Sequence, residues 1–260
     1  MIKNLCRIFL LIFCTYAPLQ AQEQPHFEKA VYHNKLDSLP YRLLYPLNYQ
    51  PSKKYPLLVF LHGMGGRGND NQKQLNGFPK ILTTIESRQG YNCFILVPQC
   101  PSTDVWVKFP QFPKSLKATS KPTKSAQLVF ELLAQLQKQL PIADRKIYVM
   151  GNSMGGEATF DFLARKPKLF AAGIPICAVA DTATAKYIAP IPIWAFHGDQ
   201  DDVNEVRYTR MMIESLKKQG GQPKYTEYPG VKHNSWDKAY VEPGLFDWLF
   251  SQERNKKKRR

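Results

Sequence analysis

The sequence has few cysteines and no long hydrophobic segment. Five of its 260 residues are cysteine, and none of them forms the C-x-x-C pair that structural zinc sites and redox motifs use. A disulfide-stapled fold is therefore excluded. No apolar run reaches the roughly 20 residues that a membrane-spanning helix needs, and the Gly-Lys-Ser/Thr ending of a Walker loop does not occur.

Part of the excess positive charge lies in the two ends of the chain. The formal net charge is +15 at pH 7, but residues 1–21 and 254–260 hold eight of the positive charges, which leaves +7 over residues 22–253. The composition, 43% apolar and 22% charged, is that of an ordinary globular protein. We therefore expect no nucleic-acid partner, and we expect residues 254–260 to form a basic disordered tail.

Residues 1–21 have the layout of a secretory signal peptide. Lys3 and Arg7 precede the apolar run Ile8–Phe13, and Ala21 offers a small residue for cleavage. The apolar run is too short to be a retained membrane anchor, and no later segment is long enough to cross a bilayer, so no membrane span is expected after removal of the signal. The sequence therefore predicts a periplasmic or secreted protein whose folded domain is residues 22–253.

Three cysteines remain after cleavage at this position: Cys93, Cys100 and Cys177. Their odd number leaves at least one free thiol. A bridge between Cys93 and Cys100 is an open alternative, since an oxidising compartment permits it.

The rest of the chain alternates short apolar runs with helical patterns. Such alternation predicts a single-domain α/β fold, with a mostly parallel central sheet and helices on both faces. The loop 98–124 is too long for a simple connection, and we expect it to lie over a site or to form a flap. Strands are expected at 27–33, 40–46, 55–62, 93–97, 146–150, 173–177, 193–196 and 224–228, and helices at 126–140, 155–165, 205–218 and 238–251.

The strongest chemical motif is Gly151–Gly156, which reads Gly-Asn-Ser-Met-Gly-Gly. A strand-like segment precedes it and a helical pattern follows it, and this strand–turn–helix is what a nucleophile elbow requires. Glycines permit the tight turn, and the Ser153 hydroxyl then stands above the sheet at a helix N-terminus. The motif alone leaves open a glycine-rich turn with an unreactive serine.

A serine nucleophile needs a base, and the base needs a group that orients it. The order serine, acid, histidine along the chain selects His233 as the general base. The acid comes from the cluster Asp199, Asp201 and Asp202. We assign it to Asp201, with Asp202 as the main rival. His197 precedes the acid and is interpreted as a structural residue at a strand end.

A second glycine-rich turn, His62–Asn71, follows the predicted strand 55–62. In this position a turn supplies one backbone N–H of an oxyanion hole, and the residue after the nucleophile supplies the other. We therefore assign the hole to the amides of Met64 and Met154. A phosphate-binding loop is the alternative, but the Lys-Ser/Thr pair that it needs is absent.

Taken together, these motifs resemble the secreted esterase branch of the α/β-hydrolase superfamily. That branch includes feruloyl and acetylxylan esterases and the prolyl-oligopeptidase-like group of peptidases. The resemblance covers about residues 27–250. It rests on His62-Gly63, Gly151-x-Ser153-x-Gly155, His197-Gly198-x-x-Asp201 and Gly230-x-x-His233-x-x-Trp236, and on Val97–Pro101 followed by Trp106.

The resemblance implies that residues 22–253 are a catalytic domain with Ser153 as nucleophile, Asp201 as acid and His233 as base. Such a domain cleaves carboxylic esters through an acyl-enzyme, with no cofactor and no metal. The substrate would be a small-molecule or polysaccharide ester, including feruloyl or acetyl groups on plant polysaccharide. Trp106 and Trp236 would border the substrate cleft.

Two alternatives remain, a prolyl-oligopeptidase-like serine peptidase and a non-catalytic binding protein with the same fold. The chain also departs from its relatives at two places. Gly66 stands where they often carry Glu, and Val203-Asn204-Glu205 replaces a Val-Val-Pro-type run. The sequence does not indicate the oligomeric state.

Overall fold

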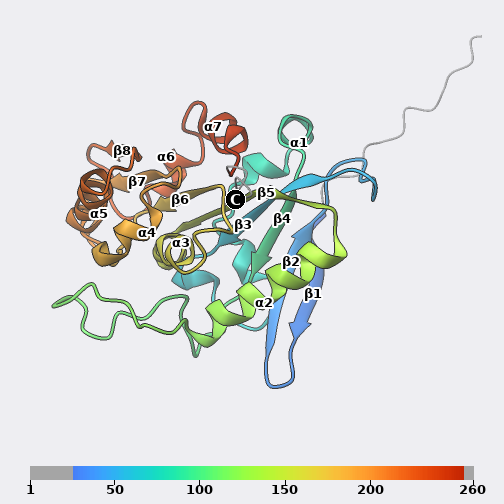
Figure 1. Ribbon diagram of the computed structural model, residues 1–260, viewed down its shortest axis with the longest axis horizontal. Helices are drawn as coiled ribbons and strands as arrows, with labels where there is room; N and C mark the ends of the chain where they lie inside the picture. Colours follow the sequence, from blue (N-terminus) through green and yellow to red (C-terminus); the bar gives the residue numbers. More distant parts are fainter. Residues whose placement is uncertain (1–25, 255–260) are drawn as a thin grey trace, which may run out of the picture.

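The computed structural model describes residues 26–254. Its centre is one eight-stranded sheet in the order β1-β2-β4-β3-β5-β6-β7-β8 (Figure 1). β2 pairs antiparallel with β1 and with β4, and the other pairs are parallel, which confirms the predicted fold class. The strands are β1 (Glu28–His33), β2 (Ser38–Leu44), β3 (Tyr55–Leu61), β4 (Phe94–Pro98), β5 (Ile142–Asn152), β6 (Ala172–Ile176), β7 (Trp194–Gly198) and β8 (Lys224–Tyr228).

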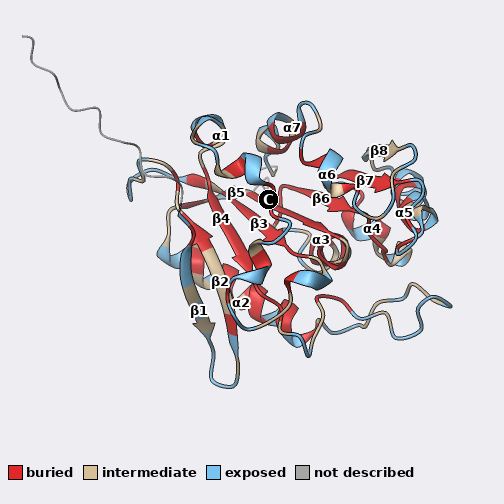
Figure 2. Ribbon diagram, turned by 180° about the vertical axis from the view of Figure 1, so that it is seen from behind, coloured by how far each residue is buried: buried red, intermediate tan, exposed pale blue. Residues whose placement is uncertain are grey.

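The central strands are buried on both faces, which explains why they read as unbroken apolar runs. Along β3, Leu57 and Val59 pack into one hydrophobic cluster, whereas Leu58 and Phe60 pack into the other. Figure 2 shows the central strands buried, while β1 at the sheet edge is largely exposed.

Helices cover the two faces of the sheet. Residues of α2, α3 and α5 pack into one cluster, and residues of α7 pack into the other, so that α2 and α7 lie on opposite sides in Figure 1. The helices are α1 (Ile85–Gly90), α2 (Lys124–Gln139), α3 (Met154–Arg165), α4 (Ala185–Ile188), α5 (Val206–Lys218), α6 (Trp236–Ala239) and α7 (Leu245–Ser251), with 3-10 turns η1 (Met64–Gly66), η2 (Lys73–Leu75), η3 (Lys80–Thr83) and η4 (Thr182–Thr184).

The expected helix 238–251 is wrong as one element, because it consists of α6 and α7 with a turn between them. Gly244 in that turn has φ 73°, a left-handed conformation that glycine adopts without steric cost. Pro243 before it lacks the N–H that a continuous helix would use. The short helices α1 and α4 were not predicted, since neither is long enough to display a clear periodicity.

Cys93 and Cys100 are not bridged, and all three described cysteines are free and buried. The two residues flank β4, which is extended. At about 3.3 Å per residue, seven residues separate their Cα atoms by roughly 20 Å, far beyond the span of a disulfide. The bridge that the sequence left open is therefore excluded in this fold.

The predicted signal peptide and the predicted basic tail lie largely outside the described residues. The predicted signal peptide 1–21 is not described, and of the predicted tail 254–260 only Arg254 is. Arg254 is ordered by pairing: its N–H donates to the Arg145 carbonyl (3.0 Å), and the Arg145 Nε donates to its carbonyl (2.7 Å). Within residues 26–254, no helix is long and apolar enough to cross a membrane.

Candidate active site

Ser153 lies at the sharp turn between β5 and α3. Its backbone has φ 54° and ψ −123°, a strained conformation for a residue with a side chain. The Ser153 N–H points at the Ile176 carbonyl (2.9 Å) and the Cys177 Sγ (3.2 Å), both at the end of β6. A Cβ atom at Gly155 would overlap the Leu61 carbonyl oxygen at the end of β3. The tight contact between α3 and the sheet therefore requires glycine there.

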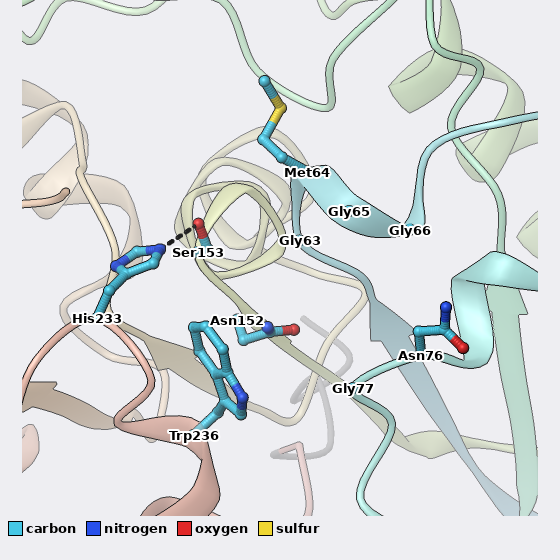
Figure 3. Close-up of a pocket in the computed structure, with 10 residues that line it drawn as sticks. All are labelled: Gly63, Met64, Gly65, Gly66, Asn76, Gly77, Asn152, Ser153, His233 and Trp236. Carbon is cyan, nitrogen blue, oxygen red and sulfur yellow. Dashed lines mark hydrogen bonds between the residues drawn. The ribbon is translucent and has the colours of Figure 1, made fainter.

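Three side chains from the carboxyl ends of different strands form one hydrogen-bonded row. The Ser153 Oγ lies 2.8 Å from the His233 Nε2, and Figure 3 shows the hydroxyl pointing at the imidazole. The other ring nitrogen, Nδ1, lies 2.8 Å from the Asp201 Oδ2 and 3.0 Å from its Oδ1. Residues 80 and 32 positions apart in sequence are thus brought into the arrangement that a serine nucleophile, a base and an orienting acid require.

The Asp201 carboxylate is buried and surrounded by donors. The backbone N–H groups of Val203 and Asn204 both donate to Oδ1 at 2.9 Å. Burial raises the pKa of Asp201, but the hydrogen bonds from His197, His233 and the two amides outweigh it and hold the pKa well below its usual range. Asp201 is therefore ionised whenever the protein is folded at neutral pH.

The other two carboxylates of the cluster do not face His233. The Asp199 Oδ1 accepts the Gly230 N–H at 2.7 Å, which ties the loop after β7 to the loop after β8. Asp202 is exposed and lies 3.4 Å from the Lys232 Nζ. Of the three candidates, only Asp201 is in contact with the imidazole.

Asn204 was not singled out from the sequence, yet it connects the parts of the site. Its N–H donates to Asp201, its carbonyl lies 2.7 Å from the His197 Nε2, and its Nδ2 donates to the Cys177 carbonyl (2.9 Å). The only sequence sign of this role is that Asn204 falls within the run that departs from the relatives.

The first glycine turn lies against the nucleophile. An ideal Cβ on Gly63 would lie 3.5 Å from the Ser153 Cβ, so the turn and the elbow are in direct contact. The buried His62 fixes the turn, because its Nε2 accepts the Cys100 N–H at 3.0 Å. Burial lowers the pKa of His62 to about 4, which keeps the ring neutral as this acceptor. Met64 begins η1 and Met154 begins α3, so both amides belong to helix starts next to Ser153.

A pocket of about 530 Å³ opens over the Ser153 hydroxyl. In Figure 3, Met64 and Trp236 lie on opposite sides of Ser153. The Trp236 indole stands edge-on to the His233 ring, with centroids 5.4 Å apart, and it borders this pocket. The lining residues are Gly63, Met64, Gly65, Gly66, Asn76, Gly77, Asn152, Ser153, His233 and Trp236.

Trp106 does not line this pocket, and that expectation is corrected. The side chain is fully buried, and its Nε1 donates to the His62 carbonyl at 3.1 Å. Trp106 thus supports the glycine turn from within the core. The hydrogen bond satisfies the one polar group of the indole, so the whole side chain can be buried without an unpaired donor.

The long loop 99–123 also contributes no residue to this lining. It is attached beside α3 instead. Arg165 of α3 donates to the carbonyls of Thr119 (2.7 Å) and Ser120 (2.8 Å), and the Ala118 N–H donates to Asp181 at 3.1 Å. The expected flap over the site is therefore wrong.

Glu157 is a further acidic group beside the row. It lies in the first turn of α3, and its Oε1 is 3.4 Å from the Asn204 Nδ2. Burial raises the pKa of Glu157 to about 7, against the opposing effects of the Asn204 hydrogen bond and of the charge on His233. This carboxyl therefore changes charge close to neutral pH.

Among residues 26–254, one set of three side chains has metal-ligating atoms close together. The atoms belong to Cys177, Asp201 and His233 and lie within 4.8 Å of one another. All three are already engaged: the imidazole and the carboxylate with each other, and the Cys177 Sγ with the Ser153 N–H. Burial also raises the pKa of the Cys177 thiol well above its usual value. Cys177 therefore supports the turn at Ser153, and Asp201 supports the imidazole of His233.

Comparison with known families agrees with this geometry. A family described as phospholipase/carboxylesterase matches residues 49–241, a range that contains every residue of the row. A curated relative, the bifunctional acetylxylan esterase/xylanase XynS20E of Neocallimastix patriciarum, is 25% identical over 204 residues. The match covers 78% of this chain and 27% of that protein, so the chain spans about a quarter of its length.

Solved structures share the fold. A thermostable esterase superposes with a TM-score of 0.81 at 34% identity, covering 88% of this chain and 63% of that one. A CE1 ferulic acid esterase of Anaeromyces mucronatus, AmCE1/Fae1A, crystallised with ferulic acid, superposes with a TM-score of 0.62 at 16% identity. That match covers 91% of this chain and 93% of the other, and at this identity it bears on the fold alone.

Proposed function

The chain belongs to the phospholipase/carboxylesterase family of α/β-hydrolases, and we propose that it is an exported serine hydrolase that cleaves carboxylic esters through an acyl-enzyme on Ser153. The observation that carries this proposal is the row Ser153–His233–Asp201, whose serine end opens into the pocket.

In the proposed reaction His233 is the general base. Its Nδ1–H donates to the ionised Asp201, which leaves Nε2 free to take the Ser153 proton across 2.8 Å. The Ser153 oxygen then attacks the ester carbonyl and forms a tetrahedral intermediate. His233 returns the proton to the departing alcohol, and water hydrolyses the acyl-enzyme by the same sequence of transfers.

The negative oxygen of the intermediate would be held by the backbone N–H groups of Met64 and Met154. Both begin helical turns, η1 and α3, beside the nucleophile, and N–H groups at a helix start are not used by the helix itself. A donor of this kind stabilises the transition state by about 3 kcal/mol.

The pocket is compatible with a compact acyl group bordered by Met64 and Trp236. The relatives named above include an acetylxylan esterase and a ferulic acid esterase. Acetyl or feruloyl esters, free or on a polysaccharide, are therefore the first substrates to test. The proposed export rests on residues 1–21, whose basic start, apolar run and small cleavage residue are those of a signal peptide.

The proposal is tested with a substrate panel on the purified full chain. p-Nitrophenyl acetate, methyl ferulate and a proline-containing peptide p-nitroanilide would be compared, together with labelling by a fluorophosphonate probe. We expect labelling at Ser153 and turnover of at least one ester. Labelling with turnover of the anilide alone would instead support the serine peptidase, and a protein that neither reacts with the probe nor turns over any substrate would support a binding protein.

A further inference from the structure

The buried side chain of His197 contacts the Asp201 carboxylate and does not line the pocket. It is fully buried in β7, and its Nε2 is 3.0 Å from the Asp201 Oδ2. The catalytic reaction as proposed makes no use of it. Its hydrogen-bond partners, however, determine how many protons the ring carries.

The first nitrogen, Nδ1, faces the Thr209 hydroxyl of α5 at 2.8 Å. That hydroxyl also lies 2.8 Å from the Ala178 carbonyl oxygen, and a carbonyl can only accept. Because a hydroxyl has one proton, Thr209 gives it to Ala178 and presents a lone pair to His197. The His197 Nδ1 must therefore carry a hydrogen.

The second nitrogen, Nε2, faces two acceptors. These are the Asp201 Oδ2 and, at 2.7 Å, the Asn204 carbonyl. A bare nitrogen here would set its lone pair against the carbonyl of Asn204, and protonating Asp201 instead would not relieve that contact. Nε2 must therefore carry a hydrogen too.

We infer that His197 is a doubly protonated imidazolium in the folded protein, and that it forms a buried ion pair with Asp201 which positions the acid and sets the basicity of His233. The Asp201 Oδ2 thus contacts two imidazoles, that of His197 at 3.0 Å and that of His233, the proton carrier of the reaction, at 2.8 Å. This inference rests on the proposed function only for its second part, the effect on His233.

The surroundings of His197 favour the positive charge. Asp201 is ionised on one side, and Glu227 of the neighbouring strand β8 lies on another. The pKa of Glu227 is lowered, chiefly by its hydrogen bonds to Arg210 and Tyr225, so this carboxylate is also ionised at neutral pH. Three further titratable residues connect to the partners of His197: His233 pairs with Asp201, and Asn204 donates to the Cys177 carbonyl and lies 3.4 Å from Glu157.

The charge has a consequence for catalysis. A carboxylate with no other charged partner would stabilise the protonated form of His233. A protonated imidazole cannot accept the Ser153 proton, so activity would be lost as the pH falls. A cation beside the same carboxylate cancels part of that effect, because both imidazoles share one negative charge. His197 therefore keeps His233 in its neutral, proton-accepting form to lower pH.

The protonation state is measured directly on the wild-type full chain by nitrogen NMR of ¹⁵N-histidine-labelled protein at pH 7.5, with His197→Gln to assign the signal. We expect two protonated ring nitrogens on His197. A bare ring nitrogen there would overturn the inference. This measurement needs no activity, so it is independent of whether the proposed function holds.

The effect on the base is measured by the pH profile of kcat/KM with p-nitrophenyl acetate. In His197→Gln the charge is lost but an amide can still donate to Asp201, and we expect the acid limb to move up by about one pH unit. Lys218→Gln is the matched control, since it removes an exposed charge from α5 that pairs with the exposed Glu214, and its acid limb should stay in place. An unshifted limb in His197→Gln would overturn the tuning role even if the ring proves doubly protonated.

Discussion

The His233 imidazole is held by the Asp201 carboxylate, at 2.8 Å from Nδ1 to Oδ2. The contact fixes the tautomer in which Nε2 can accept the Ser153 proton. In Asp201→Asn an amide replaces the ionised acceptor, and we expect kcat to fall by about 10³–10⁴-fold. The measurement is steady-state kinetics on p-nitrophenyl acetate.

Asp202→Asn is the matched control for this variant. It changes the neighbouring carboxylate, which is exposed and faces Lys232 rather than the imidazole. We expect kcat within about twofold of the wild type, since exposed ion pairs contribute little. The reverse ranking of the two variants would reassign the acid.

The two tryptophans from the sequence motifs should separate into a stability effect and a substrate effect. Trp106→Phe leaves the buried His62 carbonyl without its donor and opens a small cavity, and we expect a loss of about 2–4 kcal/mol in the free energy of unfolding.

Trp236→Ala should instead raise KM for an aromatic ester about fivefold, since it removes an aromatic surface of the pocket. Urea unfolding and kinetics on both variants check this, and a raised KM with unchanged stability in Trp106→Phe would contradict the assignment.

The Glu157 carboxyl should make stability depend on pH. Its pKa is raised to about 7 in the folded chain. Its contribution to stability is therefore fully present at a pH below the pKa of the carboxyl in the unfolded chain, and it is lost as the pH rises through 7. Glu157→Gln does not titrate. Its stability relative to the wild type should therefore grow from pH 4.5 to 8, by at most about 3 kcal/mol.

The measurement is urea unfolding of both proteins at pH 4.5 and pH 8. Glu214→Gln serves as the control, because the exposed Glu214 pairs with Lys218 and its pKa is lowered. It should show no gain with rising pH. Parallel stability curves for Glu157→Gln and the wild type would show that the Glu157 carboxyl does not carry this charge change.

Much of this site could be predicted from the sequence because it is local. The elbow around Ser153 is one hexapeptide between a strand and a helix, and the chain order then leaves few candidates for the acid and the base. The central strands could be predicted as well, because a strand buried on both faces has an unbroken apolar run in its sequence.

What the sequence could not give depends on contacts between distant segments. Trp106 and Trp236 look alike in a motif, but only the fold decides that one donates to His62 inside the core and the other borders the pocket. His197 was correctly placed at a strand end. Its proton count, however, depends on Thr209 and Ala178, which belong to α5 and to the segment after β6.

The central claim is that Ser153 performs the chemistry, and one comparison tests it most directly. Hydrolysis of p-nitrophenyl acetate would be measured for the full chain, for Ser153→Ala, and for Ser251→Ala, the serine that ends α7, whose exposed hydroxyl donates to the Trp248 carbonyl. We expect Ser153→Ala to lose at least about 10³-fold in kcat/KM, because no nucleophile remains, while Ser251→Ala keeps the wild-type value. Wild-type turnover in the folded Ser153→Ala protein would contradict the account.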